Sequence, residues 1–477
     1  MLELIQDPTV LLLMAAIGVA CVFEFINGFH DTANSVATVI YTRSLRPGQA
    51  VAWSAICNFI GVFIGGISVA MGIVKLLPME LVASGQTTLT LVTVFSMLIS
   101  SCVWNFATWY VALPASSSHA LIGSLIGVGV GNALSRGLPA SSGVNWTKTI
   151  EIGSSLLISP LLGFGIAALG LYLLSRKVDV RASADVAEGP PSWPTRLALI
   201  GSSTGVSLAH GSNDGQKGVG LIMLILITVL PARFAISSDA LMRNRGEILI
   251  ALDQMKSSLP EDLAKGPVKS KARLIPVAHA DLALLSESMN RSIEKAGEIR
   301  GILAQGTGME QISGERKLEL RKKIYALDSE LKKLESKGYS IESVRPLRNK
   351  LIGLVEYSPI WVLILVALSL GLGTTVGWKR VVETLGEKIG SGKMTYAQGA
   401  VSQTVAMGMI GASSWVGVPV STTHCLSSGI AGTMVASGYK IQKSTVRSIG
   451  LAWLLTFPVT LALSCGLFLA LKSLTGV

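Results

Sequence analysis

Apolar stretches of about 20 residues recur along the chain, and no other feature restricts its fold so strongly. They occur at about 9–41, 49–74, 88–112, 113–134 and 149–175, and again at 196–231, 351–378, 396–417, 418–438 and 447–474. Such stretches cross a bilayer as helices, because lipid offers no hydrogen-bond partners to the backbone. We therefore predict an all-α polytopic membrane protein. It has ten main segments, or twelve transmembrane segments if 9–41 and 196–231 are interrupted helices that count twice.

The composition agrees with this class and argues against several others. Of 477 residues, 50% are hydrophobic and only 14% are charged, whereas soluble domains carry about 25% charged residues. The net charge of +11 does not indicate nucleic-acid binding, because the basic residues concentrate in 232–350 together with many acidic ones. The five cysteines lie in apolar segments without a C-x-x-C pair. We therefore expect no disulfide framework and no cofactor.

The short loops between the apolar stretches are basic. Their Lys and Arg residues are Arg43, Arg46, Arg176, Lys177, Arg181, Arg196, Lys379, Arg380, Lys388, Lys393, Lys440, Lys443 and Arg447. These residues belong to four loops, which contain Arg43 and Arg46, Arg176 to Arg196, Lys379 to Lys393, and Lys440 to Arg447. With ten crossings, all four loops fall on one side of the membrane, which the positive-inside rule assigns to the cytoplasm. Both termini then lie outside.

The hydrophilic segment 232–350 is predicted to be a helical insert. Leu320, Ile324, Leu327, Leu331 and Leu334 repeat at heptad spacing among Lys and Glu, which indicates a seam that packs on other helices or on a second subunit, so a homodimer is possible. The predicted organisation is a first membrane repeat at 1–175, a cytoplasmic linker at 176–195, the start of a second repeat at 196–231, the insert at 232–350 and the remainder of the second repeat at 351–477.

Two polar motifs occur twice and in the same order. The first is Asn27-Gly28-Phe29-His30-Asp31, with Asn34 after it; its counterpart is His210-Gly211-Ser212-Asn213-Asp214, with Lys217 after it. The second is Pro114-Ala-Ser-Ser-Ser-His119 and Pro419-Val-Ser-Thr-Thr-His424. The two motifs are 122 residues further apart in the second half, close to the 119 residues of the insert. On the ten-crossing topology the halves are inverted, the pattern of secondary transporters.

The duplicated residues suggest an ion and anion site. A carboxylate inside the bilayer is costly, so Asp31 and Asp214 are candidate sites for a cation or proton. The glycines beside them suggest unwound turns with exposed peptide groups. The Ser and Thr residues after each proline either cap a helix or bind an oxyanion. The candidate anion-binding residues are Ser116, Ser117, Ser118, Ser421, Thr422, Thr423, Asn34, Asn213 and Lys217.

Some roles stay open from the residues alone. His30, His119, His210 and His424 can relay protons, but a helix-locking hydrogen bond explains His119 and His424 equally well. Glu24 and Glu356 lie beside aromatics in apolar segments, either as proton sites or as partners between helices. GSNDGQK is not a phosphate-binding P-loop, because Gly218 follows Lys217 where Ser or Thr is required.

The paired motifs resemble those of the inorganic phosphate transporter (PiT) family, most closely the bacterial low-affinity phosphate permeases. The resemblance is carried by FEFINGFHDTANSVATVIYTR at 23–43, LPASSSHALIG at 113–123, AHGSNDGQKGVGLIMLILI at 209–227 and PVSTTHCLSSGIAGTMV at 419–435. It implies a symporter in the bacterial cytoplasmic (inner) membrane, with Asp31, Asp214, Ser116 and Ser421 at the substrate and ion site.

The same resemblance bears on the coupling ion. Sodium-dependent members carry a glutamate in each second helix of the site, where Asn58 and Gln403 stand here. This favours protons, and the permeases imply a divalent metal–phosphate complex as substrate. The alternatives are sodium coupling, another tetrahedral oxyanion such as sulfate, and, remotely, an intramembrane Ser/His hydrolase. The protein is not expected to be an enzyme, because duplication with inversion has no purpose for one nucleophile and one base.

Overall fold

The computed structural model describes residues 8–74, 87–177, 191–264, 279–304, 313–390, 394–417 and 420–476. The predictions that involve Arg181, Lys393 and Pro419 fall outside these residues. The chain divides into two compact units, a membrane unit of Met1–Ile225 with Ser358–Val477 and an insert unit of Leu226–Tyr357. The described parts of both units are helices joined by turns and loops, with an isolated bridge between Gly390 and Ile441.

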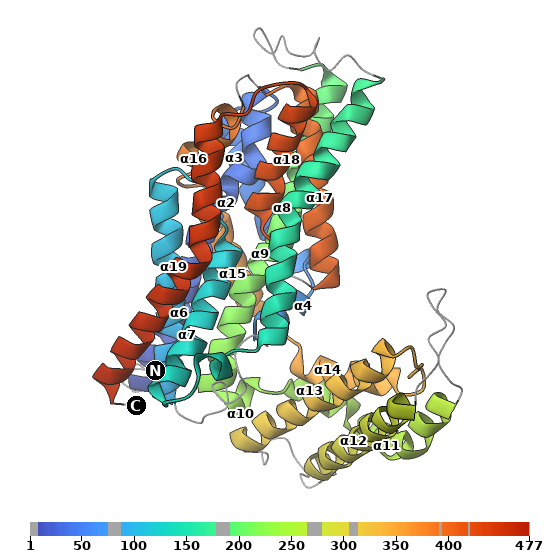
Figure 1. Ribbon diagram of the computed structural model, residues 1–477. Coiled ribbons are helices and arrows are strands. Elements are labelled where there is room, and N and C mark those ends of the chain that lie inside the picture. Colours follow the sequence, from blue (N-terminus) through green and yellow to red (C-terminus); the bar gives the residue numbers. More distant parts are fainter. Residues whose placement is uncertain are drawn as a thin grey trace. The chain divides into compact units, whose positions relative to one another are not determined.

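The membrane unit is a bundle of long helices with shorter ones among them (Figure 1). Its first half contains α2 (Pro8–Tyr41), α3 (Pro47–Ile64), α4 (Ser68–Val74), α6 (Thr87–Tyr110), α7 (Ser117–Ser135), the 3-10 turn η1 (Ala140–Gly143) and α8 (Trp146–Ser175). Its second half contains α9 (Trp193–Val229), α15 (Ile360–Thr374), α16 (Lys379–Glu387), α17 (Tyr396–Val416), α18 (Thr422–Ala436) and α19 (Lys443–Thr475).

Several of these helices span a membrane by length and composition, so the protein is an all-α polytopic membrane protein. Within the described residues, six helices meet both criteria: α2, α3, α6, α7, α19 and the Leu157–Ser175 part of α8. A seventh is added if Arg345–Val355 and Ile360–Thr374 form one broken span. The count is below the predicted ten to twelve for a physical reason. Helices α15 and α18 have only 15 residues each, or about 22 Å at 1.5 Å per residue, and α9 and α17 carry many polar residues.

The expected interruptions near Asp31 and Asp214 are not found, because α2 and α9 run unbroken through both residues. The glycines there provide close helix contact instead of unwound turns. A Cβ atom on Gly28 would lie 2.3 Å from the backbone oxygen of Leu370 in α15, and one on Gly211 would lie 2.2 Å from that of Asn58 in α3. The breaks fall after the neighbouring helices, between α3 and α4 and between α15 and α16.

The helix contacts repeat between the two halves. The first helix of the first half, α2, packs through Gly28 on α15, the second membrane helix of the second half. In the same way, α9 packs through Gly211 on α3, the second membrane helix of the first half. Likewise α7 packs on α19 and α18 packs on α8. In Figure 1, α7 runs from the middle of the unit toward the end that holds both termini, whereas α18 runs from the middle toward the opposite end. The N-termini of α7 and α18 therefore meet inside the unit.

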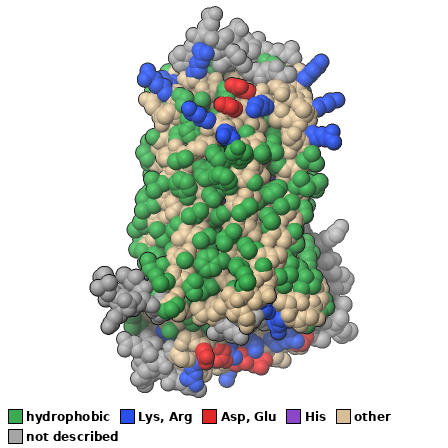
Figure 2. Space-filling view, turned by 90° about the vertical axis from the view of Figure 1, so that its left-hand side faces the viewer, with side chains coloured by type: hydrophobic (Ala, Val, Ile, Leu, Met, Phe, Trp, Pro, Cys, Tyr) green, Lys and Arg blue, Asp and Glu red, His purple; other side chains and the backbone are tan. Residues whose placement is uncertain are grey.

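The described residues at the ends of the four basic loops lie at one end of the membrane unit. Arg196 donates a hydrogen bond to the backbone oxygen of Ser44 at 2.8 Å, Gly386 packs against the ring of Tyr41, and Gly390 pairs with Ile441. Figure 2 shows a broad hydrophobic band on the flank of the unit, with Lys and Arg side chains beyond its edge at one end. The exposed Leu, Ile and Phe side chains of α3, α6, α8 and α19 belong to this lipid-facing surface.

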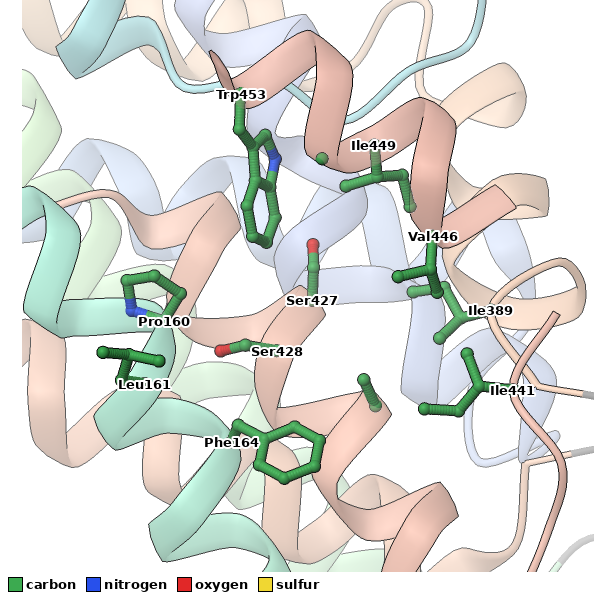
Figure 3. Close-up of a pocket in the computed structure, with 12 residues that line it drawn as sticks. Pro160, Leu161, Phe164, Ile389, Ser427, Ser428, Ile441, Val446, Ile449 and Trp453 are labelled. Atoms are coloured by element: carbon green, nitrogen blue, oxygen red, sulfur yellow. The ribbon is translucent and has the colours of Figure 1, made fainter. Parts of the chain in front are cut away.

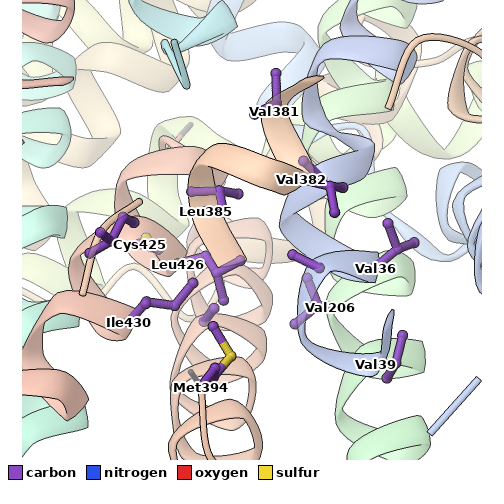
Figure 4. Packing of buried hydrophobic residues seen from close by; sticks show 14 of the residues in the cluster. Val36, Val39, Val206, Val381, Val382, Leu385, Met394, Cys425, Leu426 and Ile430 are labelled. Atoms are coloured by element: carbon purple, nitrogen blue, oxygen red, sulfur yellow. The ribbon is translucent and has the colours of Figure 1, made fainter. Parts of the chain in front are cut away.

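A hydrophobic cluster supports the end of the bundle that carries the basic loops. It joins residues of α2, α9, α16, α17 and α18, among them Val39, Val206, Val382 and Leu426 (Figure 4). The amphipathic helix α16 contributes Val381, Val382 and Leu385 from one face. This cluster fixes α18 against α2, which sets the position of the polar residues at the start of α18.

The insert unit has a hydrophobic core of its own. Its helices are α10 (Pro231–Phe234), α11 (Ser238–Ala264), α12 (His279–Ala304), α13 (Gly314–Ser336) and α14 (Arg345–Val355). The predicted heptad residues all lie in the core, where they are at most 1% exposed: Leu320, Ile324, Leu327, Leu331 and Leu334. The seam therefore packs within the unit, so it gives no support to a homodimer.

Candidate functional site

Asp31 binds the starts of α7 and α18. Its Oδ1 atom accepts hydrogen bonds from Thr423 at 2.7 Å and from Asn34 at 3.2 Å, and Oδ2 accepts one from Ser117 at 3.2 Å. His30 Nδ1 lies 3.3 Å from Oδ1. The carboxylate is only 2% exposed. One carboxylate thus connects α2 with the N-terminus of α7 in its own half and with that of α18 in the other half.

Asp214 occupies the matching position on α9. Its Oδ2 atom lies 2.9 Å from Lys217 Nζ and 3.3 Å from His210 Nε2, and accepts a 3.4 Å bond from Thr422. Lys217 also donates to Ser117 at 3.3 Å. The residue three positions after each Asp, Asn34 or Lys217, therefore binds that Asp in both halves. The two carboxylates share neighbours, since His210 Nε2 is also 3.7 Å from Asp31 Oδ2.

A chain of hydrogen bonds fixes which nitrogen of His210 carries a proton. Thr374 Oγ1 donates to the backbone oxygen of Leu370 at 2.9 Å, so it accepts the 2.9 Å bond from Asn58 Nδ2. The oxygen of Asn58 then faces His210 Nδ1 at 3.0 Å, which makes Nδ1 the donor. Nε2 consequently points at two carboxylates, an arrangement that is favourable only when a proton or a metal ion lies there.

Without a proton or metal ion at His210 Nε2, the charges of this buried group are unbalanced. Asp31 and Asp214 carry two negative charges against one positive charge on Lys217, and all three residues are at most 2% exposed. Ligand atoms of Asp31, His210 and Asp214 lie within 4.8 Å of one another, so the three can hold one metal ion. A site with one imidazole and two carboxylates is better suited to Zn²⁺ or Mn²⁺ than a site with oxygen ligands alone. The geometry can therefore bind a proton or a divalent cation.

The structure separates two roles among the Ser and Thr residues. Ser116 and Ser421 are the N-caps of α7 and α18, accepting hydrogen bonds from the backbone N–H groups of His119 at 3.2 Å and His424 at 3.1 Å. The next residues, Ser117, Thr422 and Thr423, contact the carboxylates.

The two helix starts also touch each other directly, because Ser118 donates a 3.1 Å hydrogen bond to the backbone oxygen of Val420. The site is thus closed in this arrangement.

Comparison with known proteins identifies the family. A sequence model described as "Phosphate transporter family" matches residues 27–464, which include both copies of both motifs. The chain belongs to this family. Its members are transporters, not enzymes, so the hydrolase interpretation of Ser116–His119 is set aside.

Relatives of similar length support the assignment. The chain is 40% identical to "Low-affinity inorganic phosphate transporter PitA" and to "PitB" of Escherichia coli, over 96% of each chain. It is also 40% identical to "Low-affinity inorganic phosphate transporter" of Buchnera aphidicola over the same share. A solved structure titled "The sodium-dependent phosphate transporter" has the same fold, with a TM-score of 0.55 and 20% identity over 97% of this chain and 99% of that one. The bacterial relatives and the spanning helices agree with the predicted bacterial cytoplasmic membrane.

Several predicted site residues of the transporter lie away from the carboxylates. The rings of His119 and His424 stack with centroids 4.7 Å apart, and His424 stacks on Trp453 at 3.9 Å. Asn213 donates to Ser413 at 3.1 Å. The structure thus brings His30 and His210 to the carboxylates, and places His119, His424 and Asn213 in contacts between helices.

Gln403 also differs from the expectation. It lies on α17, the third membrane helix of its half, and not on the second. It accepts a bond from Ser202 at 3.0 Å and donates to the backbone oxygen of Ser35 at 2.8 Å. By contrast, Asn58 contacts His210 directly. The two amides are therefore not equivalent.

The sequence did not single out Thr374 and Thr108. Thr374 orients Asn58, and Thr108 lies 3.3 Å from His30 Nε2. Both are isolated threonines in apolar helices, and a helical threonine usually bonds its own preceding turn, so no sequence signal distinguishes them.

A cavity of about 360 Å³ lies between α8, α18 and α19 (Figure 3). Phe164, Ile389, Val446, Ile449 and Trp453 line it, with Ser427 and Ser428 as its few polar groups. Because its walls are apolar, this cavity does not suit phosphate.

Proposed function

We propose that the protein is a symporter that imports inorganic phosphate across the cytoplasmic membrane, coupled to protons, with the phosphate carried as a complex with a divalent metal. Family membership and the names of the E. coli relatives support phosphate as substrate. The proton and the metal are supported by the chemistry of the site.

One observation carries the proposal: the starts of α7 and α18 converge on Asp31 and Asp214. A helix start offers unpaired N–H groups and the positive end of its dipole, both of which favour an anion. Two such starts, from halves that we infer to be inverted repeats with the predicted boundaries, surround one point between the carboxylates. The mirrored packing of α7 on α19 and α18 on α8 supports that inference.

Phosphate binding requires the two helix starts to part. Thr423 donates directly to Asp31, and Ser118 donates directly to Val420. An anion that enters between them must replace these bonds with bonds to its own oxygens. Opening and closing of the two halves is thereby linked to occupancy of the site, as transport by alternating access requires.

Without a cation at His210 Nε2 the site carries more negative than positive charge, which opposes binding of a bare phosphate anion. A divalent metal held by Asp31, His210 and Asp214 would offset the charge of both the carboxylates and the phosphate. The predicted metal–phosphate substrate is therefore compatible with these residues, and Lys217 is the group that can turn to the phosphate.

Proton coupling is favoured over sodium coupling by the two amides. The side-chain oxygen of Asn58 bonds His210 and its nitrogen bonds Thr374. Both side-chain polar atoms of Gln403 are hydrogen-bonded as well. Sodium prefers several oxygen ligands, and neither side chain has a carboxylate to offer.

The test is uptake of labelled phosphate into proteoliposomes that contain the purified protein. An inside-alkaline pH gradient and an inward sodium gradient are imposed separately. We expect accumulation with the pH gradient, abolished by a protonophore and unaffected by sodium. Accumulation that requires sodium at clamped pH contradicts proton coupling. Accumulation of sulfate in place of phosphate contradicts the assignment of phosphate as the substrate.

A further inference from the structure

A third carboxylate lies inside the bundle, outside the contacts described so far. Glu24 is on α2, seven residues before Asp31, so it lies on the same helix face, about 10 Å along the axis. It is completely buried. Asn27, between the two, donates to Glu24 Oε2 at 3.5 Å. A polar stripe of Glu24, Asn27 and Asp31 thus runs along α2 from the site toward the N-terminus.

The surroundings of Glu24 do not suit an ionised carboxylate. Its Oε1 atom has no hydrogen-bond partner in the described structure, and the bond from Asn27 is long. The charged groups that act on it come from α9, namely Lys217, Asp214 and His210. Lys217 is already bonded to Asp214 and Ser117. A buried carboxylate with so little compensation is stable only when it carries a proton.

Within the part of the chain that the structure describes, the other elements around Glu24 supply no further compensating charge. Cys21 of α2 and Cys102 of α6 are the titratable groups that face it from those helices. Helix α15, which packs on the same helix, has no charged residue between Ile360 and Thr374. A neutral thiol cannot replace a counter-ion.

The packing of Glu24 ties its proton to the contact between α2 and α9. A Cβ atom on Gly218 would lie 2.3 Å from Glu24 Cγ and 2.8 Å from Oε1, so the side chain rests against the backbone of α9. Separation of α2 and α9 would remove this contact and open the carboxyl to water. Because these two helices carry Asp31 and Asp214, the same movement changes the substrate site.

The counterpart position shows that the carboxylate is not needed for packing alone. Seven residues before Asp214 stands Ser207, a buried hydroxyl 3.0 Å from Ser54 Oγ. A neutral, paired group therefore serves in the second half, and only the first half has a carboxyl at this place.

We propose that Glu24 is the residue that carries the coupling proton, protonated while α2 and α9 are packed together and released when they part. This rests on the proton-coupled function proposed above. It assigns the proton to Glu24 and leaves Asp31, His210 and Asp214 to the substrate and its cation.

The test compares wild type, Glu24→Gln and the matched control Ser207→Ala, each full-length and purified in proteoliposomes. Two activities are measured: exchange of labelled for unlabelled phosphate at equal pH, and net accumulation driven by a pH gradient. Glutamine imitates a protonated glutamate in shape and charge. We expect Glu24→Gln to retain exchange and lose gradient-driven accumulation, while Ser207→Ala retains both. The infrared band of a protonated carboxylic acid in the wild type should be missing in Glu24→Gln.

Other outcomes overturn the proposal in distinguishable ways. A Glu24→Gln variant that accumulates phosphate like the wild type shows that the proton is elsewhere, and one that loses exchange as well places Glu24 in substrate binding. A wild type driven only by sodium overturns the proposed function itself. If Glu24→Gln does not fold, Glu24→Asp is measured. It should keep accumulation with a shifted pH dependence, and an unshifted one contradicts the proposal.

Discussion

Thr423 donates a 2.7 Å hydrogen bond to Asp31, across 392 positions of the sequence. It joins the second motif of one half to the first motif of the other. Ser117 contacts the same carboxylate, and His210 lies between it and Asp214. The residues that the duplication singled out thus form one buried group. A movement that separates the start of α18 from Asp31 on α2 would break it.

The hydroxyl residues should separate into two classes. Ser117→Ala and Thr423→Val remove the hydroxyls that would turn from Asp31 to the oxygens of the entering phosphate. Each such bond to a charged group is worth about 1.5–3 kcal/mol, so both variants should weaken apparent phosphate affinity roughly tenfold to a hundredfold. Ser116→Ala and Ser421→Ala remove N-caps and should lower stability by about 1 kcal/mol. Phosphate uptake kinetics and thermal unfolding of the four purified variants check this. Equal effects on affinity from both pairs contradict the division.

The glycines at the helix crossings should not tolerate a methyl group. Gly28→Ala and Gly211→Ala each drive a Cβ into the backbone of another helix, which costs about 1–3 kcal/mol where the helices cannot move apart. Gly18→Ala on α2 and Gly201→Ala on α9 are matched controls, because nothing lies within 4 Å of either position. Melting temperatures in detergent should fall for the first pair only. Unchanged values for Gly28→Ala and Gly211→Ala indicate that those positions are turns or loose contacts.

Much of this arrangement can be predicted from sequence patterns. The predictions that fail do so for identifiable physical reasons. Duplication within apolar segments indicates Asp31 and Asp214, because a carboxylate inside a bilayer is costly to keep without a function. The prediction of unwound turns at Gly28 and Gly211 is wrong, since a helical glycine at a close crossing and a glycine in a turn look alike in sequence. The register of hydroxyls after each proline is also ambiguous in sequence, because only backbone geometry decides that Ser116 caps the helix and Ser117 faces the carboxylate.

The insert unit should lose stability in acid through Asp328. Burial raises the pKa of its carboxyl, but hydrogen bonds from Lys332 at 2.8 Å and Arg348 at 2.7 Å outweigh burial and hold that pKa below its ordinary value. A lowered pKa in the folded state gives stability that is complete above the unfolded pKa of about 3.9 and is lost as the pH falls through the folded value. Hydrogen exchange of α13, corrected for intrinsic rates, should therefore quicken in acid, and less so in Asp328→Asn. An identical pH response in both proteins contradicts the role of Asp328.

Removal of divalent metal should reduce transport. If phosphate moves as a metal complex held by Asp31, His210 and Asp214, a membrane-impermeant chelator outside proteoliposomes should abolish uptake, and Mn²⁺ or Zn²⁺ should restore it. A labelled metal ion should then enter with the phosphate. Full uptake in the presence of the chelator shows that free phosphate is the substrate.

The two carboxylates that the helix starts surround are central to the proposed transport. Phosphate uptake into proteoliposomes is therefore measured for Asp31→Asn and Asp214→Asn, with the exposed insert substitution Asp253→Asn as control. All three proteins should insert and purify like the wild type, and the control should transport normally. The two site variants should show no uptake above protein-free vesicles. Wild-type rates in both would contradict a transport role and make this pair of carboxylates structural.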